Sequence, residues 1–204
     1  MEKILKNYEN AFENYSVEQL TMVKKWLNDY MVPLDKEEIV WLNLTSEELL
    51  QFLKGNYVDD NKQVMWHINW LPTALGMRYI NFLHTAGFNY LIGVIPNKVG
   101  KKTIVASLCY QKDKICSVKQ EKPVNYIQAI EVNAFYQRQG LFKVIASKIK
   151  DVMDFNKDLV ITDEEDDGIA FHIIERITGI LREQGYNGGV FARQEFNQRC
   201  RKNK

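Results

Sequence analysis

Apolar residues recur at helical spacing through the first third of the chain. Two stretches, 4–15 and 16–30, each carry an apolar stripe with a period of about 3.6 residues. Residues 16–19 have the form of a capping box, which begins a helix, and Pro33 ends the second stretch. The pattern therefore predicts two helices in this part of the sequence.

A second capping box, at 45–48, opens a shorter helical stretch. Its apolar positions run through Leu53, and Gly55 is placed to act as a C-terminal cap. A further stretch begins with Pro72, a residue suited to the first turn of a helix, and ends with Gly87. Both stretches extend the predicted helical character of the N-terminal part.

The pattern then changes from helix to strand. Short apolar runs at 90–95 and 103–110 are rich in β-branched and aromatic residues, as buried strands are. Residues 111–114 are polar and are predicted to form a turn, with 115–119 as the returning strand. A further strand is predicted over 125–132.

The last third alternates helices and strands. Amphipathic stretches at 140–153 and 169–184 predict two helices, the second capped by Gly185. The segments 159–161 and 189–192 predict short strands. The chain thus begins with helices, continues with antiparallel strands and ends with alternating strands and helices. This order is typical of an α/β (α+β) fold with a mixed, mostly antiparallel sheet flanked by helices.

The composition permits a buried core. Of 204 residues, 46% are hydrophobic and 26% are charged, which argues against disorder as the main state. The formal net charge is +1, whereas a domain that grips nucleic acid usually has a clear basic excess, so we expect no nucleic-acid partner. The basic last dozen residues are interpreted as a frayed, solvated tail, with a small anion-binding patch as the alternative.

The sequence carries no pattern typical of export or membrane insertion. Its N-terminal residues lack an unbroken apolar stretch, and no segment approaches the roughly 18 apolar residues of a membrane span. Cys109, Cys116 and Cys200 have no metal-ligand spacing, and their odd number favours reduced thiols. Cys109 and Cys116 are interpreted as buried strand residues. We therefore expect a cytoplasmic protein with no membrane partner and no metal.

The most informative segment, 130–143, joins a strand to a helix. The strand ends at Val132, a loop of polar residues follows, and the helix begins near Gly140. The first turn of a helix has backbone N–H groups without partners, which can bind an anion together with the positive end of the helix dipole. Gly140 lets a ligand approach the backbone, while Arg138 and Lys143 add positive charge. A diphosphate suits such a turn.

This segment resembles motif A of the GNAT acetyltransferases, whose loop reads Gln/Arg-x-x-Gly-x-Gly/Ala. The residues that carry the resemblance are Gln137, Arg138, Gln139, Gly140 and Leu141, preceded by Val132 and Tyr136. Phe142 departs from the small residue of the family pattern, and Ala134 replaces its usual proline. The resemblance implies that backbone N–H groups from Arg138 to Lys143 bind the pyrophosphate of coenzyme A, while the backbone around Glu131 and Val132 pairs with its pantetheine arm.

The resemblance extends over about half of the chain, across 90–196. The strands and helices come in the family's order, and the closing helix ends in a Gly-aromatic pair, Gly185 and Tyr186. It implies an acyl-CoA-binding core over 89–204, with 1–88 as a helical N-terminal region that packs on the core and contributes acceptor-side contacts. An ordinary strand–loop–helix connection in another α/β domain is the alternative.

Acetyl transfer requires a neutral amine placed against the thioester and a base that accepts the amine proton. Glu131 is the candidate base, because the resemblance places its strand beside the thioester; a solvated strand residue is the alternative. The family often has a tyrosine acid where this chain has Leu181. Tyr136, Tyr186 and His172 are the candidates to replace it.

Acidic residues at 163–167 precede the last long helix. We interpret them as favourable charge at its N-terminus, with a rim that attracts a cationic acceptor as the alternative. The resemblance implies an acyl-CoA-dependent N-acetyltransferase, in which a primary amine attacks bound acetyl-CoA directly in a ternary complex. A catalytically silent acyl-CoA-binding or interaction module is the competing hypothesis. The resemblance allows a homodimer, and the Lys-, Asn- and Ile-rich composition is typical of an AT-rich bacterial genome.

Overall fold

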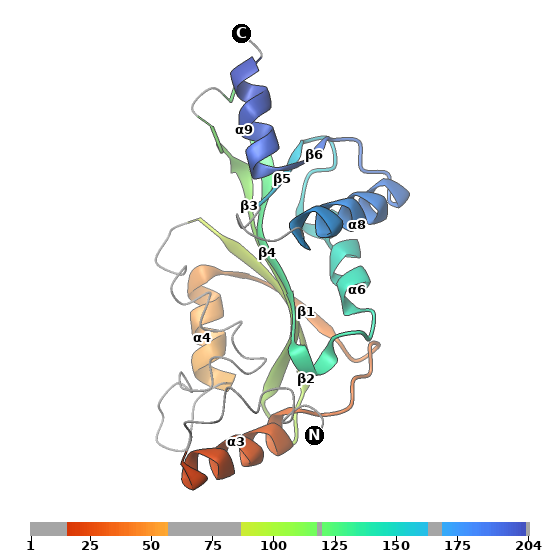
Figure 1. Cartoon of the computed structure of the whole chain (residues 1–204). Coiled ribbons are helices and arrows are strands. Elements are labelled where there is room, and N and C mark those ends of the chain that lie inside the picture. The colour runs from red at the N-terminus through yellow and green to blue at the C-terminus, as the bar shows by residue number, and fades with distance from the viewer. Residues whose placement is uncertain (1–15, 57–86, 118–119, 163–168, 203–204) are drawn as a thin grey trace.

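The computed structural model describes residues 16–56, 87–117, 120–162 and 169–202 (Figure 1). The elements in chain order are α3 (Val17–Tyr30), β1 (Val40–Thr45), α4 (Ser46–Asn56), β2 (Asn89–Pro96), β3 (Lys102–Lys114), β4 (Val124–Val132), η2 (Ala134–Tyr136), α6 (Leu141–Ser147), α7 (Ile149–Val152), β5 (Leu159–Ile161), α8 (Ile169–Glu183), β6 (Val190–Ala192) and α9 (Arg193–Lys202). The predicted helices at 4–15 and 72–87 and the acidic run at 163–167 lie outside the described residues.

The six strands form one mixed sheet whose spatial order is the order of the sequence. Neighbouring strands from β1 to β4 are antiparallel, whereas β4–β5 and β5–β6 are parallel pairs. Helix α4 lies on one side of the sheet, and α6 and α8 lie on the other (Figure 1). The predicted α/β class, with a mixed and mostly antiparallel sheet flanked by helices, is therefore confirmed.

The larger core lies between the sheet and the helices α6, α7 and α8. Its buried side chains come from β2 to β5 and from these helices, and Ile145, Ile149 and Leu181 are fully buried in it. On the opposite face, a smaller cluster around Tyr126 and Phe196 covers the sheet beneath α9. Removing these apolar side chains from water stabilises both layers of helices on the sheet.

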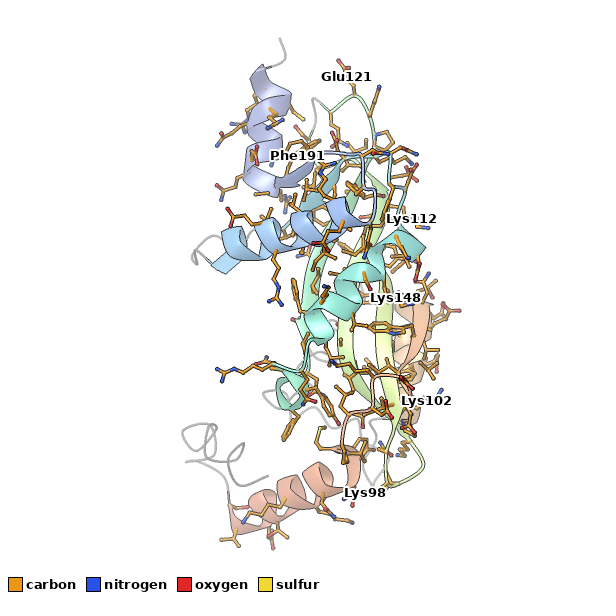
Figure 2. All side chains as sticks on the ribbon, turned by 90° about the vertical axis from the view of Figure 1, so that its right-hand side faces the viewer. Lys98, Lys102, Lys112, Glu121, Lys148 and Phe191 are labelled. Carbon is orange, nitrogen blue, oxygen red and sulfur yellow. The ribbon has the colours of Figure 1, made fainter. Side chains whose placement is uncertain are left out.

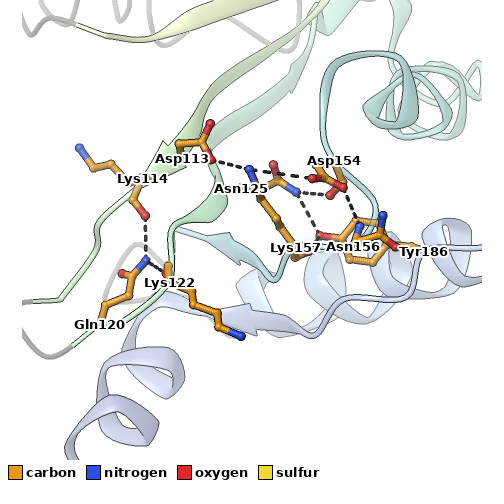
Figure 3. Close-up of polar contacts among 9 residues, drawn as sticks. All are labelled: Asp113, Lys114, Gln120, Lys122, Asn125, Asp154, Asn156, Lys157 and Tyr186. Carbon is orange, nitrogen blue, oxygen red and sulfur yellow. Dashed lines mark hydrogen bonds and ion pairs between the residues drawn. The ribbon is translucent and has the colours of Figure 1, made fainter.

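The β3–β4 hairpin corrects the strand assignments of the sequence. β3 continues to Lys114, so the turn predicted over 111–114 is wrong. Ile115, Cys116 and Ser117 lie outside any strand, and β3 pairs with β4 instead of with the predicted strand at 115–119. The connection between β3 and β4 lies later in the chain than predicted and is held by Gln120. The side-chain amide of Gln120 donates to the carbonyls of Lys114 and Lys122 (Figure 3). Its oxygen accepts from the backbone N–H of Cys116.

The second capping box is confirmed at atomic detail, although the strand before it was not predicted. Glu48 Oε2 accepts from the Thr45 backbone N–H at 2.7 Å, and the Thr45 hydroxyl oxygen accepts from the Glu48 N–H at 3.3 Å. Gly55 lies within α4, so its predicted capping role is wrong. β1 ends at Thr45 and pairs with β2, so the N-terminal region also supplies a strand of the main sheet.

Four expectations about helices and the C-terminal tail had different outcomes. α3 begins at Val17 as predicted, and Gly185 ends α8 with φ of 85°. The helix predicted over 140–153 is instead two helices, broken at Lys148, whose N–H donates to the Ile145 carbonyl in a tighter turn (Figure 2). The tail predicted to be frayed forms α9, because Phe196 packs against Phe191 and the sheet cluster.

Candidate functional site

β4 is much longer than its parallel neighbour, and this difference opens one edge of the sheet. Residues 125–127 of β4 pair with 159–161 of β5. The last link is the N–H of Thr162, which donates to the Ile127 carbonyl at 2.9 Å. Within the described residues, no strand pairs with this side of β4 from Gln128 to Val132; we call residues 128–132 the unpaired edge.

The backbone of Val132 is directed toward the unpaired edge. The N–H of Asn133 donates to the Val105 carbonyl of β3 at 2.9 Å, and backbone direction alternates along an extended strand. The carbonyl of Val132 consequently points the other way, where it accepts from the side-chain amide of Gln137 at 3.4 Å. By the same alternation, Ile130 presents its backbone groups at this edge.

The loop after β4 is fixed by two buried side chains. Asn133 accepts from the Phe135 N–H at 3.0 Å and donates to the Ile104 carbonyl at 2.8 Å. The Tyr136 hydroxyl donates to the Val32 carbonyl at 3.0 Å and accepts from the Val32 N–H at 3.3 Å. These bonds connect the loop to β3 and to the segment after α3, so its shape does not depend on a ligand.

The turn at 138–140 contains two residues in the left-handed region, Arg138 with φ of 61° and Gly140 with φ of 81°. The Gly140 carbonyl accepts from the N–H groups of Lys143 and Val144 at 3.1 and 3.4 Å. In the described part of the chain, no acceptor is found for the N–H groups from Arg138 to Phe142. Because α6 has only seven residues, this series of N–H donors matters more here than a helix dipole.

Basic side chains from three segments gather at this turn. A Cβ atom on Gly140 would lie 3.3 Å from Nζ of Lys36, so that ammonium group is close to the turn. The Arg176 guanidinium of α8 lies 4.8 Å from the centre of the Phe142 ring. Arg138 and Lys143 belong to the turn and to the first residues of α6, and both are exposed. The turn therefore combines backbone donors with positive charge, which suits an anion.

The predicted binding residues are brought together at one end of β4. Leu141 is buried, whereas Gln137, Gln139 and Gly140 are exposed with the basic residues of the turn. Phe142, the departure from the family pattern, is half-buried against the core. Val132 packs on the α6 side of the sheet, in the core that includes Tyr136.

Glu131 lies on the opposite face from Val132. Its strand partner is Ser107, and Cys109 is the next residue of β3 on the same face. Burial raises the pKa of the Cys109 thiol to about 12, a hydrogen bond with Tyr90 opposes this shift, and the nearby charge of Glu131 adds to it. Glu131 is half-buried beside a thiol that is neutral at physiological pH.

Two of the candidate acids are structural tyrosines. Tyr136 holds the Val32 backbone, and burial raises its pKa. Tyr186 donates to the Lys157 carbonyl, and burial raises its pKa to about 12. Leu181 is fully buried in the core, and the side chain of His172 lies outside what the structure describes.

The sequence analysis did not predict a polar triad of Tyr126, Gln128 and Thr162, which lies where β5 ends. The hydroxyls of Tyr126 and Thr162 lie 2.5 Å apart, and Tyr126 donates to Oε1 of Gln128 at 3.1 Å. The Thr162 hydroxyl lies 3.5 Å from the same oxygen. The spacing of Tyr126 and Gln128 along β4 was visible in the sequence, but the approach of Thr162 requires the parallel pairing of β4 with β5.

Within the described ranges, no group of three or more His, Cys, Asp or Glu side chains is placed to hold a metal ion. The three cysteines are free thiols, and Cys116, predicted to lie buried in a strand, is only half-buried outside one. None of the described helices has the length and apolar character needed to cross a membrane.

No protein-family model and no curated protein matches this chain. Among solved structures, it is similar to an aminoglycoside acetyltransferase, meta-AAC0020, from an uncultured soil metagenomic sample, in complexes with sisomicin and with trehalose. Both matches have 16% sequence identity and a TM-score of 0.40; they cover 69% and 70% of this chain and 88% of the matched chain. The fold class stated above rests on the strand order and the helix layers themselves.

Proposed function

We propose that this chain is an acyl-CoA-dependent N-acetyltransferase of the GNAT type, which moves an acetyl group from acetyl-CoA to a primary amine. The observation that carries the proposal is the unpaired edge of β4 leading directly into the turn at 138–140. An edge that no described strand pairs with suits the amides of a pantetheine arm, and a turn whose N–H donors have no acceptor among the described residues suits a diphosphate.

In this proposal, the N–H groups from Arg138 to Phe142 bind the pyrophosphate of acetyl-CoA. The N–H of Lys143, expected from the sequence to join them, is bonded to the Gly140 carbonyl, so Lys143 contributes the charge of its side chain instead. Lys36 and Arg176 add charge that the motif alone does not contain. The backbone groups of Val132 and Ile130 pair with the pantetheine arm as a neighbouring strand would. Acetyl-CoA is a co-substrate here, and the chemistry needs no metal.

The acceptor amine attacks the thioester directly in a ternary complex, and Glu131 is the candidate base for its proton. The side chain of Glu131 is on the face of α4, opposite to α6, so the amine reaches the thioester from that face. In this arrangement 89–204 is the acyl-CoA-binding core, and 1–88 contributes on the acceptor side. We further propose a cytoplasmic enzyme, with a homodimer as its candidate assembly.

A catalytically silent acyl-CoA-binding module is the second candidate. The observation that favours it is Leu181, which is fully buried where the family often has its tyrosine acid. Turnover decides between the two candidates. A panel containing a polyamine, an aminoglycoside and a lysine peptide would give acetylated product only if the chain is an enzyme.

Calorimetric titration with acetyl-CoA tests the binding site first. Gly140→Trp places a large side chain in the turn and should abolish a micromolar binding signal. Gly100→Trp is the matched control, because Gly100 also has positive φ, of 73°, but lies in the β2–β3 turn with open space around it. Equal loss of binding in both variants, or no binding by the folded wild-type protein, would refute the proposed site.

A further inference from the structure

The side-chain amide of Gln128 is held at its oxygen end by the hydroxyls of Tyr126 and Thr162. Oε1 accepts from the Tyr126 hydroxyl at 3.1 Å, and the Thr162 hydroxyl is 3.5 Å from it. Tyr126 itself is buried, with 3% of its surface exposed, and its hydroxyl is bonded to Thr162. The orientation of the Gln128 amide is therefore set by contacts with two hydroxyl groups, one of them on a buried ring.

The nitrogen end of the same amide is directed elsewhere. In a planar amide, the N–H anti to the carbonyl points away from the groups that bind the oxygen, while the other N–H lies on the oxygen side. No acceptor for Nε2 of Gln128 is found among the described residues, and Gln128 is only half-buried. Gln128 thus presents two N–H donors whose direction is fixed in advance.

Gln128 is also the first residue of the unpaired edge. The edge closes at Ile127, where Thr162 donates to the strand, and it opens toward the turn at 138–140. If the pyrophosphate of acetyl-CoA binds at that turn and its arm follows β4, its thioester end is directed toward Gln128. This step rests on the function proposed above.

We propose that Nε2 of Gln128 donates to the carbonyl oxygen of the acetyl thioester, and that Tyr126 and Thr162 are positioning residues for this amide. As the amine nitrogen bonds to the carbonyl carbon, the C=O electron pair moves onto oxygen, and the developing charge is stabilised by the Gln128 donors. The carbonyl then re-forms, the C–S bond breaks and coenzyme A leaves as a thiolate, while the amine proton passes to Glu131. A donor that is oriented before reaction needs no reorganisation as charge develops.

The test compares two ligands that differ at the carbonyl. Calorimetric affinities are measured for acetyl-CoA and for free coenzyme A, which has no thioester oxygen, using the wild-type protein and Gln128→Leu. We expect Gln128→Leu to weaken acetyl-CoA binding about fivefold and to leave coenzyme A binding unchanged, as for the loss of one hydrogen bond. Gln198→Leu removes an exposed amide on α9 and serves as the matched control.

Tyr126→Phe tests the positioning role. It removes one of the bonds that orient the amide and should give the same acetyl-specific loss, about twofold, with coenzyme A unaffected. Thermal unfolding of each variant establishes that it is folded, and Gln128→Glu, which keeps the shape but lacks the donors, replaces Gln128→Leu if that variant unfolds.

Several results would overturn the proposal. An equal loss for both ligands would mean that Gln128 only shapes the edge, and no loss for either would mean that it does not touch the ligand. If the wild-type protein binds coenzyme A but does not prefer acetyl-CoA, the role of Gln128 fails while the proposed binding site stands. If it binds neither ligand, the proposed function fails first.

Discussion

The two ends of β4 differ in whether their polar groups are hydrogen-bonded within the protein. At the paired end, the N–H of Asn125 donates to the Asp158 carbonyl. The side-chain amide of Asn125 donates to the Asp154 carbonyl at 2.6 Å (Figure 3). The Tyr186 hydroxyl completes this network through the Lys157 carbonyl. These bonds are all made within the protein, so this end contributes to stability.

At the other end, donors are left without protein partners. The N–H groups from Arg138 to Phe142 have no acceptor within the described residues, and Arg138 has a backbone conformation that an ordinary residue adopts only at a cost. Such donors and local strain persist only where the surrounding structure holds the backbone in place. Here the hydrogen bonds of Asn133 and Tyr136 hold the loop before the turn. The comparison teaches that one end of a strand can anchor the fold while the other end is reserved for a ligand.

The largest expected effect is at the paired end. Tyr186→Ala should lower the free energy of unfolding by about 4 kcal/mol, because the buried ring packs edge-on to Phe155 at 4.9 Å. Urea unfolding measures this change. Tyr186→Phe keeps the ring and should cost only about 1 kcal/mol through the lost hydrogen bonds. A cost below that of Tyr186→Phe for the alanine variant would contradict the anchoring role.

Glycine substitutions compare the left-handed turn at Gly140 with the regular helical backbone at Gly179. Gly140→Ala should cost about 1–2 kcal/mol of unfolding free energy, because φ of 81° is unfavourable for any side chain. Gly179→Ala, in the middle of α8 with open space around it, should instead stabilise by about 0.5–1 kcal/mol. Thermal and urea unfolding give both signs. A stabilising Gly140→Ala would show that the turn is not strained.

Arg138→Gly separates the effect of backbone strain on stability from the effect of side-chain charge on binding in the turn at 138–140. Glycine relieves the left-handed conformation, so the free energy of unfolding should change by less than about 1 kcal/mol. The lost guanidinium should weaken acetyl-CoA binding about fivefold at low salt, with a smaller effect at high salt. Calorimetry at two salt concentrations tests this. An unchanged affinity would remove Arg138 from the proposed site.

The smallest expected effect is at the surface of the paired end. Lys157 bonds to Asp113 at 2.5 Å, and this hydrogen bond raises the pKa of Lys157 above its ordinary value of 10.5 (Figure 3). A raised pKa in the folded state stabilises the protein below pH 10.5, and this stability is lost as pH rises through the folded value. Lys157→Met should therefore lower Tm slightly at pH 8, and the difference should shrink toward pH 11. A difference that does not shrink as the pH rises above 10.5 would indicate lost packing instead.

Local sequence signals predicted the elements that form from neighbouring residues. The capping box at Thr45 and the Gly185 cap were recoverable because each depends on side chains or backbone conformations within a few positions. The turn after β4 was located for the same reason. β1 was missed because its six residues become a strand only by pairing with β2, more than 40 positions later. The end of β3 was misplaced because Gln120, from beyond the predicted turn, fixes the hairpin.

The sequence by itself determined the alternation of helices and strands in the last third of the chain, and it determined the series of polar residues and glycine from Gln137 to Gly140. Both follow from short-range periodicity and from the backbone preferences of individual residues. Only the tertiary structure decided that β5 pairs with residues 125–127 alone, so that no described strand covers the rest of this edge of β4. It also decided that Thr162 lies at the start of this edge, and that Lys36 and Arg176 lie near Gly140 and Phe142 of the following turn. Those juxtapositions depend on strand register and helix packing between distant segments, for which local preference carries no information.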